Sequence, residues 1–489
     1  MEQELRRLPD GTYTGAMTDE HICGIFGCCG DWNRREVRIG ALTVYVYAID
    51  GITAGGDASE YVVKPLMQDA FGGTMDELYD RALHRTVYNS VAVPCGDLQS
   101  TAEKLVNGFT VVLFGQRAIA FETKTGEKRS PSAPEVENTV KGPKDAFTET
   151  VRTNTSLLRR HLRTPALRLY ETVVGRRSLT NVTLVWIDGL TDPALVQRMQ
   201  ARLAEIDIDG LLTAGDLEEY IVDSPRSPFP QLLHTERPDA FAIHLLDGRV
   251  GVLVDGLPLG FVLPAGLAAF MRVPEDSSDH FLVASMLTLL RWGALFLSLC
   301  LPAAFVAVSM YHQEMLPVKL LLSMTAAKQY VPFGVAAEVI AMLLSFELLQ
   351  EAGLRLPDPV GQTASIIGAL IVGQSAVEAK VVSPIAVIVV ALAGICGYVM
   401  PSRDLGSAVR LCRLVFVLAA VLLGLYGLIG ALALLILHLA TLESFGAPYT
   451  APFTDRDAPG ALIGLIKRPN TADKFRSPHL AGRNKRRQK

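Results

Sequence analysis

The chain has 489 residues, of which 49% are hydrophobic and 20% are charged, and its formal net charge is -4 at pH 7. This length suffices for about three domains of ~150 residues each, and so small a net charge argues against a nucleic-acid-binding protein. The seven cysteines are odd in number, and three lie in or beside apolar segments, which argues against a disulfide framework and favours a reducing setting. No apolar signal-peptide core is found at the start, so we expect the soluble part to be cytoplasmic.

The first 40 residues contain a segment rich in cysteine, from His21 to Gly30, that includes Cys23, Cys28 and Cys29. Structural zinc sites usually use two pairs of ligands with two to four residues between the members of a pair. No second pair follows in this segment. We therefore favour small hydrophobic residues in a strand or turn over a metal site, and we expect no cofactor.

Two small α/β units are predicted next, over 1–123 and 145–280, and they share one order of elements. Each opens with a strand that ends in Ile-Asp-Gly, at Gly51 and Gly189, continues with helices and closes with a hairpin. The helical patterns cover 60–68, 74–86, 98–106 and 193–205, and the hairpins cover 109–121 and 249–263. This order suggests diverged copies of one plan.

The segment 124–144, rich in Lys, Ser, Pro and Glu, is predicted to be a linker between the two units. It leads into a helical pattern that begins near Asp145, with acidic residues first and basic residues last, as suits the helix dipole. The arginines of this pattern are candidates for a subunit-contact surface, and a solvated helix face is the alternative. These candidates are Arg152, Arg159 and Arg160.

No catalytic set is found in the two α/β units. The sequence has no phosphate-binding loop, no dinucleotide fingerprint, no nucleophile elbow and no His-Glu-x-x-His motif. The segment from Ile206 to Gly210 shares two aspartates and a glycine with a calcium loop but lacks the remaining ligands, so we interpret it as a turn. We expect that the protein is not an enzyme.

A helical membrane domain is predicted over 281–444, because several runs are long and apolar enough to approach the ~20 residues that a crossing needs. In hydrocarbon such runs must be helices, since each backbone polar group needs an internal partner. The runs are 281–311, 331–349, 362–377, 381–400 and 414–440. The last run either spans with tilt or folds back around Gly427 and Gly430. The tail, 445–489, is basic and expected in the cytoplasm, which requires an even number of crossings; we expect four.

Polar side chains inside these runs indicate function, because they are costly in lipid. The candidates for lining a water-filled pore are Glu338, Gln362, Ser365 and Gln374. Hydrogen bonds between packed helices are an equally weighted alternative for the last three. Arg291 is expected to reach the lipid headgroups rather than to face a cavity.

A series of short motifs, in one order along the chain, resembles the GerA family of bacterial spore germination proteins. The motifs are Gly142-Pro-Lys-Asp-Ala-Phe-Thr-Glu149, Arg152-Thr-Asn154, Gly175-Arg-Arg177, Ile206-Asp-Ile-Asp-Gly210, Ser227-Pro-Phe-Pro230, Thr235-Glu-Arg-Pro238, Val254-Asp-Gly256, Pro274-Glu-Asp276, Glu314-Met-Leu-Pro317, Leu356-Pro-Asp-Pro-Val-Gly361, Ile371-Val-Gly-Gln374 and Phe445-Gly-Ala-Pro-Tyr449. The resemblance runs from about Phe109 to Phe453 and leaves out the cysteine-rich start and the basic tail.

The resemblance implies an A subunit of a nutrient germinant receptor or the similar SpoVAF-type paralogue. It implies an integral protein of the spore inner membrane that assembles as a homo-pentamer and forms a nutrient-gated channel for monovalent cations at the start of germination. The implied partners are the lipid bilayer, a transporter-like B subunit and a lipoprotein C subunit or another germination membrane protein, and no nucleic acid.

Three functions stay open at this point. A channel-forming subunit would place rings of polar or acidic groups around a pore. A secondary transporter would also use broken helices, although the membrane region has no visible inverted repeat. A membrane scaffold for other germination proteins would assemble without conducting ions.

Overall fold

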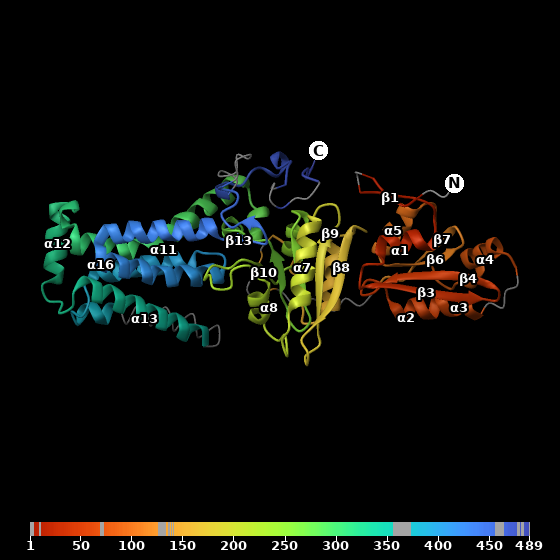
Figure 1. The fold of residues 1–489 in the computed structure, drawn as a ribbon, viewed down its shortest axis with the longest axis horizontal. Coiled ribbons are helices and arrows are strands. Elements are labelled where there is room, and N and C mark those ends of the chain that lie inside the picture. Colours follow the sequence, from red (N-terminus) through yellow and green to blue (C-terminus); the bar gives the residue numbers. More distant parts are fainter. Residues whose placement is uncertain are drawn as a thin grey trace.

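The computed structural model describes residues 4–8, 11–68, 73–125, 134, 137, 139, 141–355, 373–454, 464–476, 480 and 484–488. Three parts follow one another along the longest axis of the molecule: a first α/β unit, a second α/β unit and a helical domain (Figure 1). The C-terminal segment, drawn in dark blue, returns to the second unit (Figure 1).

The first unit is one antiparallel sheet with helices on both faces. Its strands lie in the order β3-β4-β6-β7-β5. The elements are β1 (Arg6–Arg7), β2 (Tyr13–Thr14), α1 (Asp19–Phe26), β3 (Trp32–Ile39), β4 (Leu42–Ile49), α2 (Gly55–Asp57), η1 (Ala58–Val63), α3 (Lys64–Gln68), α4 (Met75–Arg81), η2 (Ala82–Thr86), β5 (Ala92–Cys95), α5 (Leu98–Val106), β6 (Phe109–Phe114) and β7 (Arg117–Glu122). The three helical patterns and the hairpin predicted for this unit are confirmed.

The second unit is also one antiparallel sheet between helices, with its strands in the order β8-β9-β11-β12-β10. The elements are α6 (Val151–His161), β8 (Leu167–Val174), β9 (Thr180–Ile187), α7 (Pro193–Glu205), α8 (Ala214–Ile221), β10 (Leu233–Thr235), α9 (Pro238–Leu246), β11 (Val250–Val254), β12 (Gly260–Leu263), α10 (Leu267–Phe270) and η3 (Pro274–Ser277). The predicted helix over 193–205 is confirmed, and the segment from Ile206 to Gly210 follows it without regular structure.

The two units follow one plan, as their sequences predicted. When the strands of each sheet are numbered in chain order, both sheets read 1-2-4-5-3. On one face, α1 and α5 of the first unit correspond to α6 and α9 of the second, and on the other face α2 to α4 correspond to α7 and α8. The first hairpin of each unit ends in the same turn, where Gly51 (φ 84°) and Gly189 (φ 79°) adopt the left-handed conformation that glycine tolerates.

Two local predictions in these units were wrong. The first part of the cysteine-rich segment lies in helix α1 instead of a strand or turn, because the Thr18 side chain caps the helix and acidic residues occupy its first turn. Its second part, with Cys28 and Cys29, follows the helix as the expected turn. Helix α6 begins at Val151 instead of near Asp145. The Asp255 carboxylate accepts a hydrogen bond from the Val151 amide at 2.9 Å. A residue distant in sequence thus pairs one of the backbone N–H groups that the start of this helix leaves without a partner.

The helical domain follows the second unit. Its elements are α11 (Phe281–Tyr311), η4 (Gln313–Met315), α12 (Val318–Lys328), α13 (Val335–Arg355), α15 (Pro384–Tyr398) and α16 (Arg403–Thr441). Among the described residues, two helices, α11 and α16, are long and apolar enough to cross a membrane, and α15 is a shorter apolar helix. The predicted run 362–377 lies mostly outside the described residues, so the expected four crossings stay a prediction.

Helix α16 folds back on itself at Gly424. This residue leaves the helical conformation (φ 59°, ψ -137°) and packs against Tyr311 at the end of α11. Both ends of α16 return to the second unit, since Asp404 lies 3.2 Å from His234 and His438 lies 2.9 Å from the hydroxyl of Ser227. The fold-back alternative is therefore confirmed, with the turn at Gly424 instead of at the two later glycines (Figure 1).

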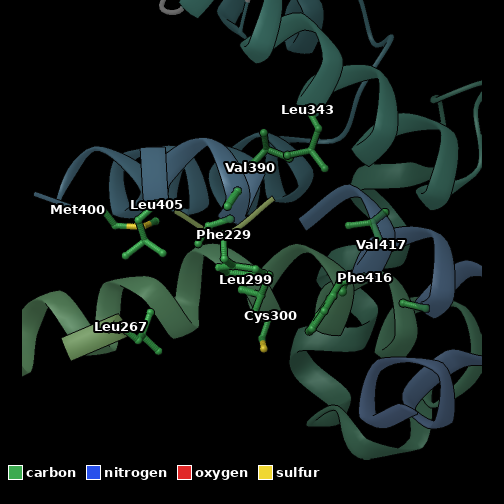
Figure 2. Packing of buried hydrophobic residues seen from close by; sticks show 14 of the residues in the cluster. Phe229, Leu267, Leu299, Cys300, Leu343, Val390, Met400, Leu405, Phe416 and Val417 are labelled. Carbon is green, nitrogen blue, oxygen red and sulfur yellow. The ribbon is translucent and has the colours of Figure 1, made fainter. Parts of the chain in front are cut away.

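One continuous apolar core joins the second unit to the helical domain. Phe229, Leu267 and Met271 come from the second unit and are nearly or fully buried. They pack with residues from the long helices, among them Leu299 of α11 and Phe416 of α16, as Figure 2 shows for most of them. Because protein interiors are densely packed and transmit strain, the second unit and the helices should move as one body.

Candidate functional site

Glu338 lies in the first turn of α13 and is buried inside the protomer. One carboxylate oxygen accepts a hydrogen bond from the amide of Ser383 at 2.9 Å, and the other lies 3.5 Å from the Lys328 ammonium. Ser383 caps the N-terminus of α15, where the helix dipole favours a negative charge. Glu338 thus connects α12, α13 and α15, and its side chain has no exposed area. A pore-lining role stays a prediction, and this conformation offers no protomer surface for it.

Glu347 lies two and a half turns further along α13 and contacts a different helix. Its carboxylate lies 2.5 Å from Arg413 and 3.3 Å from Arg410, both on α16. Ser402 caps the N-terminus of α16, so both arginines lie within the first three turns of this helix. The Arg413 side chain is almost fully buried, and the ion pair fixes α13 against α16.

The other pore candidates differ in what the structure describes. Gln374 lies on the helical segment 373–378, is exposed and donates to the Glu378 carboxylate at 3.0 Å. Gln362 and Ser365 lie outside the described residues. Gln374 is therefore the one candidate that the described part of the chain presents at a surface.

Arg291 is engaged within the protomer, and its expected reach to the lipid headgroups stays a prediction. Its guanidinium forms two hydrogen bonds with the Asp276 carboxylate, at 2.6 and 3.0 Å, and a third with the Met271 carbonyl. Each side chain of this pair is 12% exposed. A bidentate arginine–carboxylate pair compensates much of the desolvation that a lone arginine would suffer, so Arg291 fixes α11 to η3.

The contact between the two α/β units is built around a buried ion pair. Arg159 of α6 reaches across to Asp31 of the first unit at 2.6 and 2.9 Å, and both side chains are 1% exposed. The subunit-contact candidate Arg159 is thus placed between the two units of one chain, where it presents no surface to another subunit. Sequence spacing could not reveal the pairing because 128 residues separate its members.

Two further arginines make this contact reciprocal. Arg152 of α6 lies 3.3 Å from Asp50 of the first unit, and it also pairs with Glu171 at 2.9 Å. Conversely, Arg7 of the first unit lies 2.7 Å from Asp188 of the second. Asp50 and Asp188 occupy the same position in the two copies of the plan, so each Asp-Gly turn is contacted by an arginine from the other unit.

The remaining candidate, Arg160, is exposed on α6, which fits the solvated-face alternative and leaves a subunit contact as a prediction.

Near the interface between the two α/β units, the Cys29 thiol and the Arg168 guanidinium stabilise the thiolate of Cys28 and lower its pKa to about 6. Within the described ranges, no group of three or more His, Cys, Asp or Glu side chains could hold a metal ion.

The chain is similar to known spore germination proteins over nearly its whole length. The family model described as "Bacillus/Clostridium GerA spore germination protein" matches residues 20–478, which includes the cysteine-rich start and most of the tail that the predicted resemblance left out. Spore germination protein KA of Bacillus subtilis (strain 168) is 34% identical over 473 residues, covering 94% of this chain and 86% of that protein.

A second germination protein and one solved structure are also similar to the chain. Spore germination protein GerLA of Bacillus cereus is 36% identical over 465 residues, covering 93% of each chain. The crystal structure of the N-terminal domain of the A subunit of the Bacillus megaterium spore germinant receptor GerK3 is 28% identical and covers 54% of this chain and 98% of that one, with a TM-score of 0.41. On the length of the family match and these identities, the chain belongs to the GerA family of spore germination proteins.

Proposed function

We propose that this chain is the membrane subunit of a spore germination complex and that it assembles into a homo-pentamer forming a nutrient-gated cation channel. The channel releases monovalent ions at the start of germination. The family membership and the germination proteins among the relatives support the germination role. The helical domain lies in the spore inner membrane, with both α/β units in the cytoplasm.

The observation that carries this proposal is the apolar core shared by the second unit and the helices. Phe229, Leu267 and Met271 of the second unit pack on the same buried surface as α11, α13, α15 and α16. A rotation of the second unit would therefore displace the helices with it, as a gate requires. A transporter-like B subunit that binds the nutrient and a lipoprotein C subunit are the expected partners.

The length of the helices supports a membrane-spanning arrangement. Each half of α16, 403–423 and 425–441, is about 25 to 32 Å long at the usual helical rise. This is close to the ~30 Å of a hydrocarbon core. The two halves run away from the second unit and back to it, which keeps the tail on the same side as the α/β units.

The test is ion flux through the full-length chain in liposomes that carry a potassium gradient, with and without the partner subunits and nutrient. We expect nutrient-dependent potassium release. Gln374→Ala should change the ratio of potassium to sodium flux if this exposed side chain lines the pore. Arg38→Gln is the matched control, because Arg38 is a highly exposed side chain in the distant first unit.

A non-conducting membrane scaffold is the second candidate. It is favoured by one observation. Glu338 and Glu347 of α13 both form ion pairs within the protomer, with Lys328 and Arg413. An intact oligomer that passes no ions under any nutrient condition would support the scaffold and contradict the channel. A secondary transporter would instead be a monomer or dimer in mild detergent.

A further inference from the structure

The C-terminal segment is attached to the start of α11. The Lys467 ammonium donates to three backbone carbonyls, those of Asp276 (2.5 Å), Ser277 (3.0 Å) and Asp279 (2.9 Å). The Lys467 amide also donates to the hydroxyl of Ser285, in the first turns of α11. Because α11 is the first helix of the proposed membrane domain, these contacts place the segment where the chain enters the membrane (Figure 1).

Beyond Lys467 the segment lies against the turn after α9. Arg476 donates to the carbonyl of Leu246 at 2.7 Å. Arg487 lies 3.5 Å from the Asp247 carboxylate and 2.9 Å from that of Asp473. The tail is thus docked on the second unit through its arginines, and Lys467 connects it to the start of α11.

The cations of this surface outnumber its carboxylates. Arg249, Arg272 and Arg476 each interact electrostatically with the Asp247 carboxylate, and Arg487 forms an ion pair with it. The other carboxylates near them are Asp473 of the tail and Asp276, which pairs with Arg291. Burial and, to a smaller extent, the neighbouring Arg272 lower the pKa of Arg249 to about 10, against the opposing effect of the Asp247 carboxylate.

Arg249 is a buried member of this cluster. Its Nη1 donates to the carbonyl of Pro264 at 2.9 Å, but its buried Nε has no hydrogen-bond partner among the described residues. Because this Nε is buried, Arg249 adds positive charge beneath the surface, and a ligand would contact the exposed cations of the tail instead.

Apolar side chains are exposed among these cations. Phe475 is 70% exposed and lies between Lys474 and Arg476, while Ile466 and Leu246 are 38% and 37% exposed. Basic residues that alternate with an exposed aromatic ring are typical of surfaces that lie in the membrane interface. A free anion would explain the arginines but not the exposed apolar side chains.

We propose that this surface, formed by 464–476, 484–488 and the turn after α9, binds the headgroups of anionic phospholipids in the cytoplasmic leaflet. The inference rests on the proposed membrane placement of the helical domain. The basic side chains bind lipid phosphates, and the exposed Phe475 enters the interface, as do the exposed Leu282 and Met286 near the start of α11. The contact holds the second unit against the membrane and so fixes its orientation relative to α11.

The experiment is native mass spectrometry of the full-length chain in mild detergent, titrated with phosphatidylglycerol or with phosphatidylcholine. We expect phosphatidylglycerol to bind more tightly. In the double variant Arg476→Gln/Arg487→Gln its affinity should fall about 25-fold, since each cation near an anionic surface contributes about fivefold. Arg38→Gln, in the distant first unit, should bind as the unmodified chain does.

A second variant separates lipid binding from tail docking. Lys474 and Lys485 are exposed. The Lys474→Gln/Lys485→Gln variant should therefore lower the affinity for phosphatidylglycerol, as the arginine double variant does, while the tail stays docked. Equal binding of both lipids, or unchanged binding in both double variants, overturns the proposal. Displacement of phosphatidylglycerol by millimolar inorganic phosphate also overturns it, in favour of a free-anion site. The readout needs no ion flux, so it can fail separately from the channel proposal.

Discussion

The second α/β unit has two neighbours, and it contacts them by opposite means. Toward the first unit the contact is charged and includes the buried pair of Arg159 and Asp31. Toward the helical domain the contact is apolar and includes Phe229 and Met271. Buried ion pairs depend strongly on both partners and on geometry, whereas apolar burial is non-directional. The first contact is therefore suited to fixing one relative orientation of the two units, and the second to transmitting a movement.

The largest effect is expected where the charged contact is broken on one side. Arg159→Ala leaves Asp31 buried without its partner, which should destabilise the docking of the two units by about 3 to 5 kcal/mol. Thermal unfolding of the full-length chain, followed by the fluorescence of Trp32 beside Asp31, measures the effect. The double variant Arg159→Met/Asp31→Leu should recover most of the loss, and no recovery would contradict the charge-based account.

Nearly as large an effect is expected at the apolar contact, but with a different signature. Met271→Ala removes a fully buried side chain and should cost about 2 to 5 kcal/mol through lost burial and a cavity. Thermal unfolding at low and high salt measures the effect. The destabilisation by Met271→Ala should be similar at both salt concentrations, and a strong salt dependence would show that this contact is not apolar as described.

A smaller effect is expected for the charge inside the helical domain. Glu338→Gln keeps an oxygen that can accept from Ser383 but removes the charge opposite Lys328, so it should destabilise the domain by about 1 to 2 kcal/mol. The ratio of potassium to sodium flux should stay unchanged, because the side chain is buried in the protomer. A changed ratio would return Glu338 to the ion path.

At the rim of the charged contact the expected effect is below about 1 kcal/mol. Arg152 and Asp50 are 36% and 50% exposed, so solvent screens their pair. Arg152→Ala should lower the unfolding temperature far less than Arg159→Ala does, and added salt should abolish the difference from the unmodified chain. An equal loss for the two arginines would mean that burial does not set their contributions.

The smallest effect concerns pH. Asp145 raises the pKa of His161, and His161 lowers that of Asp145. The contribution of His161 to the free energy of unfolding is present below about pH 6.5 and is lost as the pH rises through its raised pKa. The contribution of Asp145 is lost as the pH falls below about 4. The unfolding temperature difference between the chain and His161→Asn should therefore be larger at pH 5.5 than at pH 8.5.

Local sequence patterns predicted much of the fold but few of the contacts. Periodicity and turns placed α5, α7, α11 and both Asp-Gly turns, because these depend on neighbouring residues. The start of α6 was misplaced because Asp255, over 100 residues away, completes it. The pairings of Arg159 with Asp31 and of Glu338 with Ser383 were likewise invisible, since spacing along one sequence does not reveal which distant elements meet.

The central claim is that the helices of several copies surround a water-filled path, and single-particle imaging of the full-length chain in mild detergent tests it most directly. The account predicts a ring of five protomers with a central lumen and with the α/β units at one end. A lone protomer, or any oligomer whose helices meet without a lumen, would contradict it and leave a membrane scaffold as the function.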